Sequence, residues 1–445
     1  MELGRDMQRD IRAYAAMVLR LKKRVVTRLL RLRRKTKATF FTPSGLSKTN
    51  QDSSRVDRSS LRGKVMCGYQ GWFSCPDDQQ RLGWRHWAKD LGKPMAPGNA
   101  SFDLWPDVSE LPEASLFSTD YRHADGRPAM LFSSVSPDLV AMHFRWMREY
   151  GLDGIFLQRF ATELNEGRRQ SQRDRVLGLV QSEALAKGRV FALMYDLSGS
   201  DDSRLSLVLQ DWQFQRESRG FDSSESYLHH DEKPLVALWG LGFSDGRNYS
   251  LDACAKLIEA LKREGCTVLL ATPSWWRSGK NDATNDPKVL DVFKSADIIS
   301  PWSVGRYHSP VSASRFIKTV WQPDLEWCAE HGLEFMPVIF PGFSWHQMKG
   351  GTFDAIPRLG GEFLWSQIFA AHQIGCEMLY VAMFDELDEA TAIFKYETDP
   401  PVSASEQFLS LQDTAPDHYL YLVGEARKGI RGEIPITRKM PVRDL

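Results

Sequence analysis

The sequence lacks the short motifs that mark several large enzyme classes. It contains no phosphate-binding loop of the Gly-x-x-x-x-Gly-Lys-Ser/Thr type and no His-Glu-x-x-His pair. P-loop nucleotide chemistry and the common zinc protease site are therefore excluded. Gly240, Gly242 and Gly246 are spaced wrongly for a dinucleotide-binding loop. We therefore expect a function that needs no bound cofactor.

Cysteine is scarce, at six of 445 residues, and no two cysteines form a Cys-x-x-Cys pair. This excludes the usual zinc sites and implies no disulfide framework, although Cys67 and Cys75 are close enough in sequence to bridge. Net charge is also absent, but the first 37 residues hold 13 lysines and arginines against three acids. The rest of the chain is negative by about ten charges, which disfavours nucleic acid as a partner.

Residues 1–40 are the strongly basic part of the chain. Apolar residues recur every three or four positions from Ile11 to Leu32, which predicts an amphipathic helix. Its longest uncharged run, 13–19, is too short to span a bilayer. We expect peripheral contact with an anionic membrane, an atypical targeting segment or a solvated tail. The polar stretch 41–60 predicts a linker, 61–430 the folded domain and 431–445 a tail.

From residue 64 onward, short apolar runs alternate with longer segments of helical period. Eight parallel strands covered by helices predict a (β/α)8 TIM barrel, with a long loop insert over 70–135 after the first strand. A doubly wound open sheet is the alternative fold. The expected strands are 64–69, 154–159, 189–196, 235–240, 266–271, 297–301, 335–340 and 377–384, and the expected helices are 136–150, 172–187, 203–218, 251–264, 286–294, 311–331 and 361–374.

The carboxyl ends of the predicted strands carry many of the polar residues and of the 14 tryptophans. Active sites of barrels lie at this end. Flat aromatic faces with interspersed hydrogen-bonding groups suit a neutral sugar. The residues expected to bind carbohydrate are Tyr69, Gln70, Trp72, Trp87, Asp103, Trp105, Gln158, Arg159, Tyr195, Asp196, Trp239, Arg306, Tyr307, Trp345, Asp385 and Asp388.

Four carboxylates crowd the stretch AMFDELDEATAIF, directly after the last predicted strand: Asp385, Glu386, Asp388 and Glu389. Like charges held close in a barrel mouth of low dielectric cannot all ionise, so one carboxyl keeps its proton while another stays anionic. Glycoside cleavage needs such a pair. Glu386 and Glu389 are three positions apart and can share one side of a turn. We predict that these two glutamates are the catalytic residues.

Several motifs together resemble the bacterial glycoside hydrolases related to families 71 and 99: VMCGYQGWFSCPDD, GWRHW, FDLWPDVSEL, YDLSG and AMFDELDEATAIFK. The resemblance covers about residues 64–395. In the endo-α-mannosidases of family 99, a Glu-x-x-Glu after the last strand supplies both catalytic carboxylates. By this resemblance, Glu386 would be the base that activates the 2-hydroxyl of the substrate, giving an anhydro-sugar intermediate. Glu389 would be the acid/base at the leaving oxygen.

The sequence departs from family 99 at two places in this motif. Leu387-Asp388 stands where the family typically has Trp-His, and Ala390 stands in place of glycine. The predicted function is therefore a metal-independent glycoside hydrolase acting on an α-linked neutral poly- or oligosaccharide, with α-mannoside and α-glucan both open.

Two alternatives belong to other classes. One is a carbohydrate-binding barrel that has lost turnover, which the changes at 387, 388 and 390 motivate. The other is a metal-dependent barrel enzyme that would hold Mg²⁺ or Mn²⁺ on the acidic run with help from Asp196 and His346. The resemblance implies export, whereas the first 40 residues do not resemble an ordinary signal peptide.

Overall fold

The computed structural model describes residues 55–411 and 414–443. The chain divides into two units after Asp52, and every element described below belongs to the second unit, Ser53–Leu445. The predicted amphipathic helix, its expected membrane contact and most of the predicted linker therefore lie outside the described residues. Within the described part, we find no helix that combines the length and the apolar character needed to cross a bilayer.

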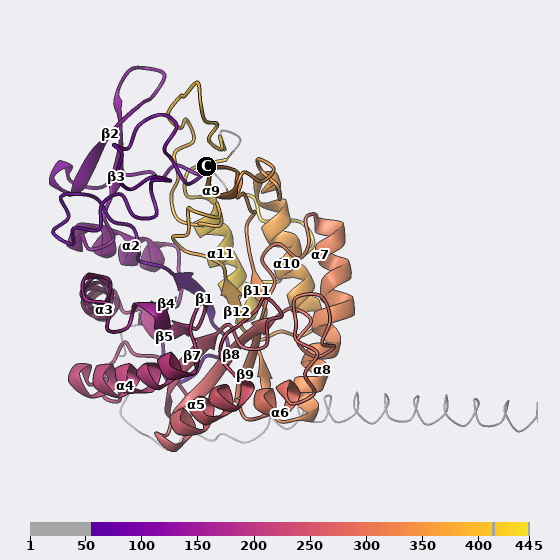
Figure 1. Ribbon diagram of the computed structural model, residues 1–445. Helices are drawn as coiled ribbons and strands as arrows, with labels where there is room; N and C mark the ends of the chain where they lie inside the picture. Colours follow the sequence, from indigo (N-terminus) through magenta and orange to yellow (C-terminus); the bar gives the residue numbers. More distant parts are fainter. Residues whose placement is uncertain (1–54, 412–413, 444–445) are drawn as a thin grey trace, which may run out of the picture. The chain divides into compact units, whose positions relative to one another are not determined.

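The central sheet has eight parallel strand positions, and helices alternate with them along the chain (Figure 1). The predicted barrel architecture is confirmed. In chain order, the strands are β1 (Val65–Tyr69), β4 (Gly154–Phe160), β5 (Val190–Asp196), β7 (Lys233–Trp239), β8 (Thr267–Pro273), β9 (Ile298–Trp302), the pair β10 (Glu334–Phe335) and β11 (Val338–Ile339), and β12 (Leu379–Val381).

The seventh strand position closes the ring because it pairs on both sides. Its first half, β10, pairs with β9, and its second half, β11, pairs with β12. The N–H of Met336 donates to Ile299 O at 2.9 Å, and Pro337 O accepts the N–H of Tyr380 at 3.0 Å. The expected continuous strand over 335–340 is thus split, since Pro337 has no N–H for a ladder and the segment changes partner there. The open-sheet alternative is wrong.

The covering helices match the predicted segments with small shifts at their ends. One exception is the expected helix over 311–331. It contains a π-helical turn at 317–321, and Pro323, which cannot donate to the helix ladder, follows just after that turn. A helix after β12 was not predicted. The helices are α2 (Pro137–Glu149), α3 (Arg168–Lys187), α4 (Asp202–Arg219), α5 (Leu251–Arg263), α6 (Val289–Lys294), α7 (Pro310–Phe316), α8 (Gln322–Glu330), α10 (Glu362–Gln373) and α11 (His418–Ile430).

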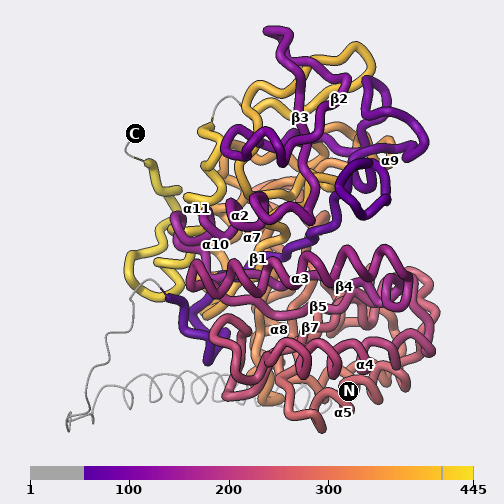
Figure 2. The backbone as a smooth tube through the Cα atoms, turned by 90° about the vertical axis from the view of Figure 1, so that its left-hand side faces the viewer, coloured from indigo at the N-terminus to yellow at the C-terminus, as the bar shows by residue number. Residues whose placement is uncertain are grey.

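The insert 70–135 packs its apolar side chains into the hydrophobic core of the domain. It contains an antiparallel hairpin that the sequence did not predict, β2 (Leu116–Arg122) and β3 (Pro128–Phe132). Trp105 and Tyr121 pack against Phe408, with ring centroids 5.2 and 5.7 Å apart. The chain after β12 therefore returns to the insert, and Figure 2 shows the two segments together at the top of the view.

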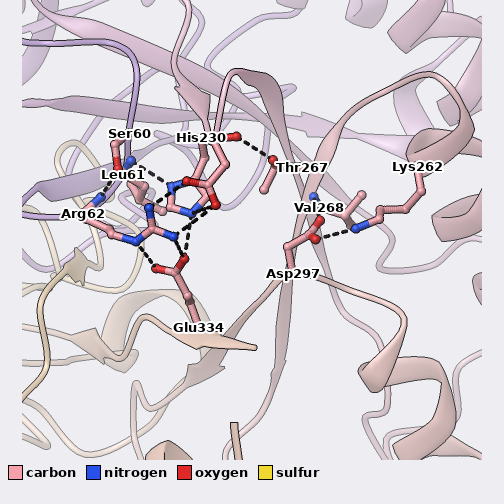
Figure 3. A network of polar contacts seen from close by, with 10 residues as sticks. Ser60, Leu61, Arg62, His230, Lys262, Thr267, Val268, Asp297 and Glu334 are labelled. Atoms are coloured by element: carbon pink, nitrogen blue, oxygen red, sulfur yellow. Dashed lines mark hydrogen bonds and ion pairs between the residues drawn. The ribbon is translucent and has the colours of Figure 1, made fainter. Parts of the chain in front are cut away.

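The opposite, amino-terminal end of the barrel is closed by polar contacts (Figure 3). The guanidinium of Arg62 pairs with the carboxylates of Asp231 and Glu334. His230 accepts the N–H of Leu61 on Nδ1 at 3.1 Å, so its proton lies on Nε2, which donates to Glu334 at 2.9 Å. This network holds the start of the folded chain against the sheet.

Both ends of the described chain pack on the barrel. The N–H of Val56 donates to Gly188 O at 2.9 Å, within the stretch expected to be linker. The indole N–H of Trp365 donates to Thr437 O at 2.9 Å, and Ile436 is buried, within the expected tail. All six cysteines are buried free thiols, so no bridge joins Cys67 and Cys75.

Candidate active site at the barrel mouth

The acidic run lies on a loop that follows β12. Backbone hydrogen bonds join the two ends of this loop. The N–H of Met383 donates to Thr391 O at 3.2 Å, and the carbonyl of Glu386 accepts the N–H groups of Thr391 and Ala392 at 3.1 and 2.9 Å. The guanidinium of Arg358 donates to the carbonyls of Ala390 and Ala392 at 2.8 and 2.7 Å. These bonds hold the loop in one conformation at the mouth of the barrel.

Ala390 keeps the backbone conformation that favours glycine. Its φ is +53°, in the left-handed region, which costs alanine more conformational energy than glycine. The N–H of Ala390 donates to Leu387 O at 2.9 Å, and Arg358 binds the Ala390 carbonyl. The turn over residues 387–390, which carries Glu389, therefore forms with alanine at the position where family 99 has glycine.

Asp385 supports the site without facing it. Its two carboxylate oxygens accept the backbone N–H groups of Gln70 and Gly71 at 2.7 and 2.8 Å, and its side chain is buried. Burial raises the pKa of Asp385 to about 7, and the two backbone hydrogen bonds act in the opposite direction. Asp385 thus fixes the loop after β1 against the loop after β12.

Asp388 is paired with an imidazole from the insert. Oδ2 of Asp388 lies 2.8 Å from Nδ1 of His86, and the His86 ring stacks on Trp72 with centroids 4.0 Å apart and planes within 4°. Burial raises the pKa of Asp388 and lowers that of His86, where neighbouring Arg85 adds to the effect. The hydrogen bond joins the insert to the acidic loop, and burial disfavours the charged form of both groups.

A cluster of ion pairs contacts the loop that follows β1. Glu163 accepts from Arg85 at 2.5 Å and from Arg173 at 2.6 Å. Burial is the largest influence on the pKa of Glu163 and would raise it, but the two arginines together lower it. Arg173 also donates to the carbonyl of Gln70 at 2.6 Å. Gln70 is therefore held on one side by Asp385 and on the other by Arg173.

The two predicted catalytic glutamates have strongly perturbed carboxyl groups. Glu386 is 5% exposed, and burial raises its pKa well above the ordinary value, with Glu389 and Asp388 adding and the Gln70 side chain opposing. Glu389 is half-buried, and burial raises its pKa to about 7, with Asp388 adding and a hydrogen bond from Trp345 opposing. Because each added negative charge makes the next harder to form, the pair retains a proton in the neutral pH range.

Aromatic side chains extend from this pair across the mouth. Tyr380 on β12 accepts from Gln158 Nε2 at 3.2 Å, and the charge of Glu386 adds to the burial that raises the Tyr380 pKa. The ring of Trp302 lies 6.0 Å from that of Tyr380, and Trp239 lies 5.5 Å from Trp302. Trp239 and Trp302 are half-buried, so part of each ring is open to a ligand. Tyr380 is not among the residues predicted from the sequence.

Gly68 makes room for Tyr380. A Cβ at this position would lie 2.2 Å from the Tyr380 hydroxyl and 2.2 Å from Sδ of Met383. Such distances are far below van der Waals contact. The interior face of β1 is therefore left without a side chain where the base of the acidic loop passes.

Three of the predicted sugar-binding residues point away from the mouth. Tyr69 bonds His143 on α2 at 2.9 Å, and Arg159 and Tyr195 both bond Asp211 on α4, at 2.6 and 2.7 Å. Successive side chains on a strand alternate between its two faces. Since Gln158 faces the interior, Arg159 faces the helices. These three residues join the strands to the surrounding helices.

Five further predicted residues lie in packing or capping contacts. Trp87 and Trp105 are in the hydrophobic core, and Asp103 accepts the N–H groups of His346 and Gln347 at the start of α9 (His346–Lys349). The other two are Tyr307, which donates to Gln367 at 2.9 Å, and Arg306, which pairs with Asp282 at 2.7 Å.

The residues that the structure brings to the mouth are fewer. Trp345 is 38% exposed and hydrogen bonds to Glu389. Asp196 ends β5 and accepts the N–H of Ser198 at 2.7 Å, and burial raises its pKa. The predicted residues linked to the glutamate pair, directly or through neighbouring side chains, are Gln70, Trp72, Gln158, Trp345, Asp385 and Asp388. Asp196 and Trp239 end neighbouring strands at the same end of the barrel.

Among the described residues, the acidic run contributes to no group of three side chains placed to ligate one metal ion. The one described group of three side chains placed to ligate a metal is His230, Asp231 and Glu334, at the amino-terminal end of the barrel. Arg62 already occupies both of those carboxylates. The imidazole of His346 contacts Gly351 O at 2.8 Å and does not join the mouth. The described residues at the mouth therefore show no preformed set of three metal ligands.

Solved structures share this fold, although no family model and no curated protein matches the chain. The endo-α-mannosidase of glycoside hydrolase family 99 from Bacteroides thetaiotaomicron superimposes with a TM-score of 0.62 at 15% identity, over 84% of this chain and 99% of that one. A structure described as a glycoside hydrolase-like protein gives 0.50 at 14% identity, over 88% and 98%. The resemblance that the motifs indicated is thus confirmed at the level of the fold.

Proposed function

We propose that this protein is a glycoside hydrolase that cleaves an α-linked neutral oligosaccharide or polysaccharide with Glu386 and Glu389. The observation that carries the proposal is the shared environment of these two carboxyls. They lie on one tied loop at the barrel mouth, and burial and neighbouring carboxylates raise both pKa values. A pair that keeps one proton supplies an acid and a base from the same residue type.

The sequence resemblance implies a role for each member of the pair. An endo-α-mannosidase shares the fold, and the sequence resemblance implies that Glu389 protonates the departing oxygen while Glu386 takes the proton of the 2-hydroxyl. The 2-oxygen then attacks the anomeric carbon as the glycosidic bond breaks. Water opens the resulting anhydro sugar by the reverse proton transfers. Glu389 is the more exposed of the two, as a group that must reach a leaving oxygen should be.

These roles require that the pair hold one proton when substrate is bound. Burial raises the pKa of both carboxyls, that of Glu386 well above its ordinary value and that of Glu389 to about 7. The proposed acid is Glu389, so the shared proton has to lie on Glu389 in the substrate complex. Strongly coupled carboxyls titrate as a pair, and a bound hydroxyl can change which member holds the proton.

Hydrolysis of α-mannan and α-glucan oligosaccharides by the Glu386→Gln and Glu389→Gln variants tests the proposal. We expect each variant to lose at least about a hundredfold in kcat, because general acid–base catalysis is worth on the order of 10²–10⁴. Glu377→Gln is the matched control, since Glu377 is exposed and precedes β12. Full activity in both active-site variants would contradict the proposal. Sugar binding by the wild type without any product would favour the barrel that only binds.

A further inference from the structure

A groove of about 450 Å³ lies beside the mouth, between the loops that follow β7 and β8. Its volume is within the range of roughly 300–1,000 Å³ that is usual for small-ligand sites. Both loops leave the carboxyl ends of their strands, so the groove opens on the same end of the barrel as the glutamate pair. Its lining includes Phe243, Ser244, Arg247, Tyr249, Thr284 and Lys288.

Aromatic rings connect the groove to the glutamate pair. The Phe243 ring lies 5.1 Å from the ring of Trp239, and the Arg247 guanidinium lies over both rings, at 5.0 and 5.4 Å. Trp239 in turn contacts Trp302, which contacts Tyr380 beside Glu386. Phe243, Trp239 and Trp302 are all half-buried. A chain of ring faces that are partly open therefore runs from the catalytic pair to the groove.

The charges of the groove balance. Arg247 and Lys288 line it together with Asp252 and Asp286. Asp245, which does not line the groove, accepts from Arg247 at 2.7 and 2.9 Å. A lining without net charge attracts neither anions nor cations, whereas hydroxyl groups and aromatic faces suit a neutral polyhydroxylated ligand.

Ser244 belongs to a Gly-x-Ser-x-Gly pentapeptide, residues 242–246, which raises the question of a second catalytic centre. Its hydroxyl donates to the carbonyl of Asn281 at 3.1 Å. None of the described residues that line the groove is a histidine. The serine therefore has no base beside it, and the groove is suited to binding and not to nucleophilic chemistry.

We propose that this groove is a distal subsite for the same neutral glycan, which occupies it while the bond to be cleaved lies at Glu386 and Glu389. The inference rests on the proposed function. A glycan bound at both places would run along Trp302 and Trp239, stacking sugar rings on the open part of these two faces. Long oligosaccharides then gain binding energy that short ones cannot reach, which raises their kcat/KM.

Chain-length dependence tests the subsite. We would measure kcat/KM for a disaccharide and a heptasaccharide of the α-manno and α-gluco series, with the wild type and with Phe243→Ala and Arg247→Ala. We expect the ratio of the long to the short substrate to fall about tenfold in both variants. Phe214→Ala is the matched control, because Phe214 is 63% exposed on α4, away from the groove. An unchanged ratio in both groove variants would overturn the proposal.

Binding separates failure of the subsite from failure of the proposed function. If the wild type cleaves no saccharide, the proposed function fails, and titration calorimetry with the two heptasaccharides tests the groove alone. Affinity about tenfold weaker in Phe243→Ala than in the wild type, with unchanged urea unfolding, would support the subsite. Equal affinity, or no binding by the wild type, would overturn it.

Discussion

Replacing Asp385 by alanine tests whether the two loops of the site are held by one carboxylate. The side chain accepts two backbone N–H groups, from Gln70 and Gly71, and is buried. Alanine leaves both donors buried without a partner, at about 1–3 kcal/mol each. We therefore expect the free energy of unfolding to fall by about 2–6 kcal/mol. Asparagine keeps one acceptor oxygen, so Asp385→Asn should lose about half as much.

Activity should fall together with stability. The Gln70 side chain acts on Glu386, and its backbone position depends on Asp385 and Arg173. A shift of this loop moves Gln70 away from Glu386. Since catalytic rates are sensitive to displacements of about 1 Å, we expect kcat of Asp385→Ala to fall by one to two orders of magnitude, about 10–100-fold.

Urea unfolding followed by fluorescence measures the stability, and initial rates on an α-linked aryl glycoside measure kcat. Asp291→Ala is the control, because Asp291 is exposed on α6 and makes only a surface ion pair with Lys294. The reasoning would be refuted by an Asp385→Ala protein that unfolds at the same urea concentration as the wild type and retains its kcat.

Three further predictions concern the base of the acidic loop and the glutamate pair. Gly68→Ala should destabilise the protein by about 1–3 kcal/mol in urea, because its Cβ would overlap Tyr380. Gly178→Ala, within α3, should be neutral or stabilising, and equal losses in both variants would count against the steric argument. In the wild type, kcat/KM should rise as pH rises through about 7, because both glutamates are protonated below that value, and loss of one proton from the pair above it leaves the base that the reaction needs. A fall of kcat/KM over that range would contradict this titration. On a glycoside with a strongly acidic phenol as leaving group, Glu389→Gln should recover most of its lost rate and Glu386→Gln should not, whereas recovery by Glu386→Gln alone would reverse the roles.

The barrel itself could be predicted because its signal is local. Each strand is an apolar run and each helix has its own period, so strand order follows from the alternation alone. The acidic run could be placed at the mouth for the same reason, since it directly follows a strand. The split at Pro337 was also open to prediction, because proline cannot donate within a ladder.

The direction of individual side chains was predicted less well. Adjacent residues at a strand end were both assigned to the mouth, although only one of each pair can face it. Side chains on a strand alternate between its two faces, so only one residue of each neighbouring pair can face the mouth. By this rule, Gln158 and Asp196 face the mouth, whereas Arg159 and Tyr195 face the helices. The same reasoning places Tyr380 inside, two residues before the strand leaves for the loop.

The contacts between the insert and the acidic loop could not be predicted from local signals. His86 and Asp388 are 302 positions apart, and nothing in either neighbourhood indicates the other. Trp87 and Trp105 were interpreted as binding surfaces because the hairpin β2–β3 was missed, and without it nothing indicated that the insert packs into the core. Long-range pairing of this kind depends on the tertiary structure.

The pairing of His86 with Asp388 also bears on how this protein can change over evolution or by engineering. The imidazole and the tryptophan it stacks on belong to the first loop of the barrel, whereas the carboxyl belongs to the last. Grafting the acidic loop alone onto another barrel would bury Asp388 without its partner, and deleting the insert here would do the same. The two segments are therefore expected to be inherited and exchanged as one unit.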